Sequence, residues 1–70
     1  MDSSQMAQVA SKYGFTHTPG NGNDFFSHGD ILVVRDGLVY DIMVMGVHKS
    51  SIRSGLANAL LTASYYIPYR

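Results

Sequence analysis

Apolar residues dominate the segment from Ile31 to Met45, which is broken only near Asp36-Gly37. An Asp-Gly pair between two runs rich in β-branched residues indicates a β-hairpin, because a type I′ turn requires positive φ at both central positions. A two-residue turn at this point sets Val33 opposite Tyr40. The segment is therefore predicted to form two antiparallel strands joined at Asp36-Gly37.

Both faces of the predicted hairpin are apolar. One face carries Ile31, Val33, Leu38, Tyr40, Ile42 and Val44, and the other carries Leu32, Val34, Val39, Met43 and Met45 together with Asp41. Burying an unpaired carboxylate is costly, so the face with Asp41 is predicted to be exposed and the other face to form the core. Exposed apolar patches usually mark interfaces, and methionine adapts to irregular partners. The alternative is that helices cover both faces of the hairpin, in which case no apolar face is left exposed for a partner.

Two helices are predicted, one at each end of the chain. Ser3 or Ser4 can cap the first, over about residues 3–13, and Gly14 can end it. Ser50 or Ser51 can cap the second, which runs to about residue 67. Their buried stripes at helical spacing are Met6, Val9, Ala10 and Tyr13 in the first helix, and Ile52, Leu56, Ala59, Leu60, Ala63 and Ile67 in the second. A weaker stripe of Ala57, Leu61 and Tyr65 lies on the far side of the second helix.

The stretch between the first helix and the hairpin contains mainly turn residues. Residues 15–18 are β-prone, and residues 19–24 lack an apolar side chain other than proline. Residues 24–27 either return as a strand antiparallel to the first or form an irregular loop held by two phenylalanines. The predicted fold is a single α+β domain over residues 1–70, in the order α-β-β-(β)-α. It is a small antiparallel meander of two to three strands, flanked by an N-terminal and a C-terminal helix on one face.

Composition narrows the class of protein. The chain has 70 residues, 46% of them hydrophobic, and no cysteine, so a monomer gains stability only from packing or from association. Five basic side chains balance five acidic ones and are scattered along the chain, which disfavours a nucleic-acid partner and mildly favours self-association. No apolar stretch is long enough to span a membrane, and residues 1–5 lack the features of a secretion signal. We therefore expect a cytoplasmic protein without membrane association.

Candidate chemistry is sparse. His17, His28 and His48 have no helical spacing to one another or to a carboxylate, and His28 with Asp30 would supply only two metal ligands. The loop at residues 20–23 resembles a phosphate cradle in its glycines, but it leads into a strand-like segment rather than a helix. The sequence therefore predicts no metal, no cofactor and no catalytic residue.

One resemblance offers an alternative. Tyr13-Gly14-Phe15 at the end of the first helix, Ser27-His28 near a strand and Ile52-Arg53 near the last helix resemble HicA-type toxins, which cleave mRNA. The resemblance implies a double-stranded-RNA-binding-like fold with His28 as the catalytic base. The chain departs from that family in lacking a basic surface and in placing Gly29-Asp30 directly after the histidine.

The leading prediction is a small non-enzymatic regulator or inhibitor that sterically occupies a surface of a host protein complex, as phages and mobile elements encode. Homodimerisation and a structural or assembly role remain open alternatives. In the tyrosine-rich C-terminus, Tyr66 and Ile67 are predicted to close the core. Tyr65, Tyr69 and Arg70 are predicted to contact a partner, because tyrosine and arginine often contribute most to binding at interfaces. The predicted partner-binding residues are Leu32, Val34, Val39, Asp41, Met43, Met45, Arg53, Ala57, Leu61, Tyr65, Tyr69 and Arg70.

Overall fold

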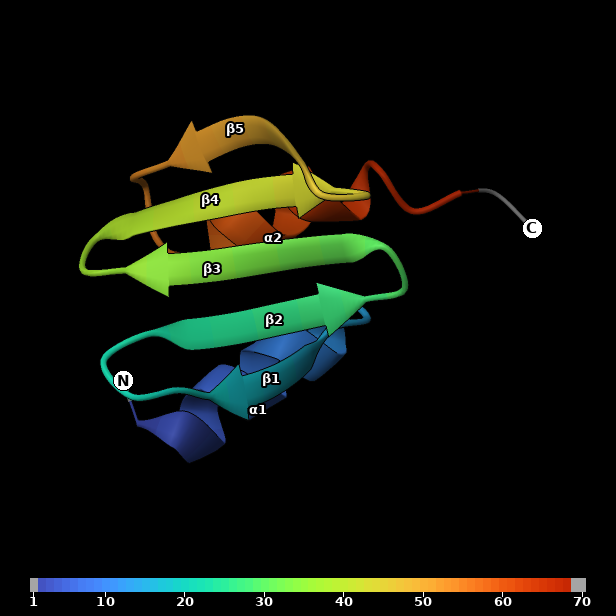
Figure 1. Cartoon of the computed structure of the whole chain (residues 1–70). Helices are drawn as coiled ribbons and strands as arrows, with labels where there is room; N and C mark the ends of the chain where they lie inside the picture. The colour runs from blue at the N-terminus through green and yellow to red at the C-terminus, as the bar shows by residue number, and fades with distance from the viewer. Residues whose placement is uncertain (1, 69–70) are drawn as a thin grey trace.

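The computed structural model describes residues 2–68 as a five-stranded antiparallel sheet with both helices packed on one face (Figure 1). The strands follow one another in chain order across the sheet. The elements are α1 (Ser3–Lys12), β1 (Thr16–Pro19), β2 (Asp24–His28), β3 (Ile31–Asp36), β4 (Val39–Val44), β5 (Val47–Ile52) and α2 (Leu56–Ser64). This confirms the α+β class and the meander. The predicted count of two to three strands is wrong, because the order is α-β-β-β-β-β-α.

The core lies between the sheet and the two helices. Phe26, Val33 and Ile42 stand opposite one another on β2, β3 and β4, and all three are fully buried. The predicted helical stripes cover them, through the buried residues Met6, Ala10, Leu56, Ala59, Leu60 and Ala63. Of the proposed core face of the hairpin, Ile31, Val33, Tyr40 and Ile42 are buried and Val44 packs against them.

Strand β5 includes Ser50, Ser51 and Ile52, which the sequence predicts to cap and begin the second helix. It pairs with β4 from Val47 to Ile52, with a register shift between Ile42 and Met43. Such a bulge gives one strand an extra residue, so that side chains three positions apart can lie on the same face. His48 and Ser51 are such a pair, since they stand opposite Met43 and Asp41. Ser50 and Ser51 therefore lie in a strand and cap no helix. α2 begins only at Leu56, after Gly55, and no side chain caps it.

The turn of the central hairpin is displaced from its predicted place. Asp36 pairs with Val39, so Gly37 and Leu38 form the turn, and Val33 faces Ile42 rather than Tyr40. Gly37 has a φ of 64°, which only a glycine adopts easily. The register moves by two residues, so most side chains keep their predicted face. Two predicted assignments are wrong, because Leu38 is 83% exposed in the turn and is not part of the core, and Met45 lies in the β4–β5 turn rather than on a strand face.

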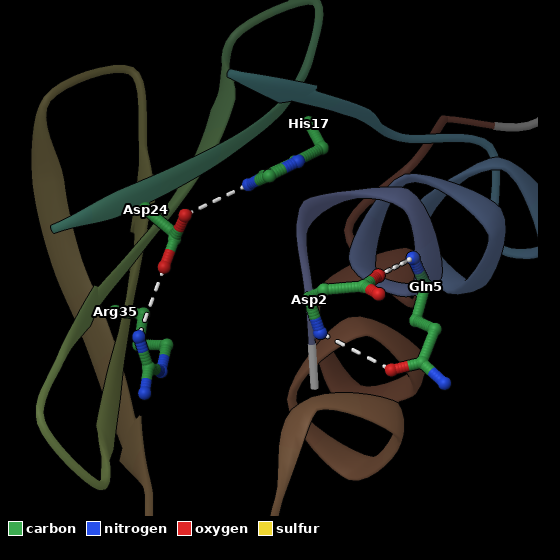
Figure 2. Close-up of polar contacts among 5 residues, drawn as sticks. All are labelled: Asp2, Gln5, His17, Asp24 and Arg35. Carbon is green, nitrogen blue, oxygen red and sulfur yellow. Dashed lines mark hydrogen bonds and ion pairs between the residues drawn. The ribbon is translucent and has the colours of Figure 1, made fainter. Parts of the chain in front are cut away.

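Helix α1 begins at Ser3 as predicted, but its N-cap lies one residue before the predicted caps. Asp2 is the N-cap: its carboxylate accepts the Gln5 backbone N–H at 2.9 Å, and its own N–H donates to the Gln5 side chain at 3.1 Å (Figure 2). This reciprocal capping box replaces the predicted Ser3 or Ser4 cap. Gly14 follows the helix with a φ of 84°, as its predicted role requires.

Within residues 2–68, neither helix has the length and apolar composition that crossing a membrane requires.

Candidate functional site

The face of the sheet opposite the helices holds those predicted partner-binding residues that lie on β3 and β4. Leu32 and Met43 stand opposite each other there, and Val34 stands between Phe25 and Asp41 in a second cross-strand row. These side chains and Val39 are half-buried, whereas their neighbours on the covered face are buried. The structure thus brings Leu32, Val34, Val39, Asp41 and Met43 together on one uncovered surface, which we call the open face.

Asp41 is a carboxylate on the open face, between Val34 and Ser51, and its charge is partly satisfied. The Ser51 hydroxyl donates to Asp41 Oδ1 at 2.6 Å, and His48 Nε2 lies 3.5 Å from the same oxygen. His48 Nε2 also contacts the Ser51 Oγ at 3.0 Å. The sequence did not suggest this cluster, because residues 47–52 were not expected to be a strand. Both contacts use one imidazole nitrogen, so the histidine does not bridge carboxylate and hydroxyl as a hydrolytic triad requires.

The remaining predicted residues lie elsewhere. Met45 belongs to the β4–β5 turn instead of the open face, and it is 75% exposed. Arg53 is exposed just after β5. Ala57 and Leu61 are exposed on α2, and Tyr65 is exposed directly after it. This helix lies on the covered side of the sheet (Figure 1). Tyr69 and Arg70 lie outside the described residues. The predicted site is therefore not one continuous surface.

A buried polar cluster links β1, β2 and β3 on the covered face. Asp24 accepts hydrogen bonds from His17 Nε2 and Arg35 Nη1, each at 2.9 Å (Figure 2). The His17 hydrogen bond contributes most to lowering the pKa of Asp24; burial opposes it, and the Arg35 hydrogen bond adds to the lowering. The His17 side chain is only 2% exposed and its ring stacks on Phe26 at 5.0 Å. This histidine–carboxylate pair is therefore a structural link without access to a substrate.

His28 is the last residue of β2. Its Nδ1 lies 2.7 Å from the Gly14 carbonyl oxygen, which can only accept, so Nδ1 carries the proton and donates it. The Phe15 ring stands beside it at 5.8 Å, tilted by 55°. The fixed tautomer leaves Nε2 as an acceptor in the neutral ring.

His28 lines a pocket of about 280 Å³ at one end of the sheet. Three segments form it: the β2–β3 turn, the β4–β5 turn and the residues that follow α2. The sequence could not indicate this pocket, because it depends on the meeting of two turns and a helix end. Among residues 2–68, no three histidine, aspartate or glutamate side chains gather closely enough to hold a metal ion.

No protein-family profile matches this chain, and no curated protein and no solved structure is significantly similar to it.

Proposed function

We propose that this chain is a non-enzymatic protein-binding regulator that docks through the open face and sterically occupies part of a host protein complex. The observation that supports the proposal is the one-sided packing of the sheet. Both helices lie on one face, and the apolar side chains Leu32, Val34, Val39 and Met43 on the other face have no helix over them.

The charge of this face suits a protein partner better than a nucleic acid. Its apolar part holds the Asp41 carboxylate, and the chain as a whole has no net charge with neutral histidines. Nucleic-acid affinity derives mainly from neutralising phosphates with lysine and arginine. The apolar side chains Leu32, Val34, Val39 and Met43 resemble the apolar core of a protein interface.

Photo-crosslinking in the native cell tests this proposal. A photoreactive amino acid replaces Met43 on the open face, and in a matched control it replaces Gln8, which is exposed on α1. Specific crosslinks from position 43 to one distinct protein, lost on Val34→Glu, support the proposal. Equal crosslinking from both positions contradicts it.

Light scattering over a range of protein concentrations separates the alternatives. If the crosslinks join two copies of this chain and the protein forms a closed dimer in solution, the partner is a second copy of the chain and not a host protein. Growth of higher oligomers with concentration would indicate the structural or assembly role.

The geometry of His28 is the one observation that favours a ribonuclease. It lies on a strand, as the HicA resemblance implies, and its Nδ1 donates to the Gly14 carbonyl, which leaves Nε2 as the acceptor of the neutral ring. Against this, Asp30 lines the same pocket, and a carboxylate repels a phosphodiester. RNA cleavage that disappears on His28→Ala, with unchanged circular dichroism, would replace the binding proposal with the enzymatic one.

A further inference from the structure

The pocket beside His28 has a rigid frame. Its two turns are tied together by a hydrogen bond from the Met45 backbone N–H to the Asp30 carbonyl oxygen, at 2.9 Å. Tyr66 and Pro68, which follow α2, complete the lining that the described residues provide. Because segments distant in sequence meet there, the shape of the pocket depends on the whole fold.

Met45 is in a conformation that its residue type disfavours. Its φ is 53°, and it is the one non-glycine residue with positive φ in the described part of the chain. Gly46 follows with a φ of 78°, so the pair has the positive φ angles of a type I′ turn, which favours Asn-Gly. A side chain in this region costs about 1 kcal/mol.

The same methionine contributes little to the core. Its side chain is 75% exposed, and it forms part of the pocket lining. Backbone strain that persists at an exposed apolar residue points to a role in recognition, because an asparagine would serve the turn better. Tyr66, 39% exposed, adds a second apolar surface at the same pocket.

The chemistry of the lining selects the ligand. Ile31, Val44 and Pro68 supply further apolar walls. Asp30, which is exposed, brings a negative charge to the lining, and His28 adds an imidazole. No lysine or arginine appears in the lining that residues 2–68 provide. A ligand that fits has an apolar group and carries hydrogen-bond donors with positive charge.

We propose that this pocket binds a peptide segment of a partner protein in which an aromatic residue precedes a basic one. The aromatic ring packs against Met45, whose sulfur makes favourable contacts with aromatic rings. The basic side chain pairs with Asp30 at the rim. This site is separate from the open face and does not depend on the function proposed for that face.

The probe is N-acetyl-phenylalanyl-arginine amide, titrated into the isotope-labelled protein and followed by heteronuclear NMR. We expect amide shifts centred on residues 28–31 and 44–46, with a dissociation constant of about 1 mM for so small a ligand. The phenylalanyl-glutamate analogue should bind about tenfold more weakly at low salt, because Asp30 repels it. Asp30→Asn should remove most of that difference.

A second variant separates recognition from folding. Met45→Asn should weaken binding of the probe about fivefold or more, and yet raise the urea midpoint of unfolding, since Asn-Gly suits the turn. If Met45 had only a structural role, the variant would lose both probe binding and stability. The proposal is overturned if the probe causes no shifts at about 10 mM, if its shifts lie on the open face, or if Met45→Asn binds it as well as the natural chain.

Discussion

The two faces of the sheet are built from the same strands and differ in what covers them. Phe25 and Phe26 are adjacent in β2, yet Phe26 is fully buried beneath the helices while Phe25 is half-buried on the open face. The Phe25 ring packs against the backbone at Gly20, where an added Cβ would lie only 2.6 Å from the ring. Alternation along a strand thus separates side chains that stabilise the fold from side chains available to a partner.

Replacing each of these phenylalanines tests that division most severely. Phe26→Ala removes a large side chain from the closed core and should lower the free energy of unfolding by about 3–5 kcal/mol. A domain of this size has little stability to lose, so the variant should be largely unfolded at room temperature. Phe25→Ala, the matched control, should lose about 1–2 kcal/mol and stay folded. Urea titrations followed by circular dichroism measure both, and equal losses would show that the open face is part of the core.

The two aspartates of the sheet make a smaller test of the same division. Asp24→Ala leaves His17, whose side chain is only 2% exposed, without its acceptor, so we expect a loss of about 2–3 kcal/mol. Asp41→Ala breaks contacts on the open face, where ion pairs and hydrogen bonds are worth at most about 1 kcal/mol. A larger loss at Asp41 would contradict the assignment of the faces.

The acid dependence of stability identifies the Asp24 contribution. Its pKa in the folded protein lies below the ordinary 3.8, so the unfolded chain binds its proton first as the pH falls. The stabilisation is fully present above about pH 5 and is lost as the pH falls through the folded pKa. In Asp24→Asn that part of the pH dependence should be absent. Urea midpoints of both proteins between about pH 6 and pH 3 should converge towards the acid end.

Regular patterns in the sequence predicted the elements that periodicity determines. The central part of each helical stripe and most of the two faces of the hairpin followed from spacing alone, because burial on one side imposes it. The predicted second helix was too long at both ends, since Ile52 lies in β5 and Ile67 lies beyond α2. A turn displaced to Gly37-Leu38 left the faces unchanged, since the shift was by two residues. The division of core from open face was therefore predictable even where the register was not.

Elements that depend on neighbours were not predictable in the same way. Val47–Ile52 contains few apolar residues and two serines suited to helix caps, and it becomes a strand by pairing with β4. The Asp41–Ser51–His48 cluster depends on that pairing. The pocket beside His28 depends on the hydrogen bond between two turns, and the positive φ of Met45 leaves no trace in residue type.

The smallest predicted effect concerns how the helices are held on the covered face. α1 has a reciprocal capping box between Asp2 and Gln5, whereas α2 begins at Gly55 without a side-chain cap. Asp2→Ala should lower the free energy of unfolding by about 1 kcal/mol, and Ser4→Ala, at an exposed position of the same turn, should have little effect. Hydrogen exchange should localise the Asp2→Ala effect to the amides of α1 while β3 and β4 keep their protection relative to global unfolding. If amides throughout the sheet lost protection equally and α1 showed no additional loss, the effect of the cap would be global rather than local. The capping box would then not distinguish α1 from α2.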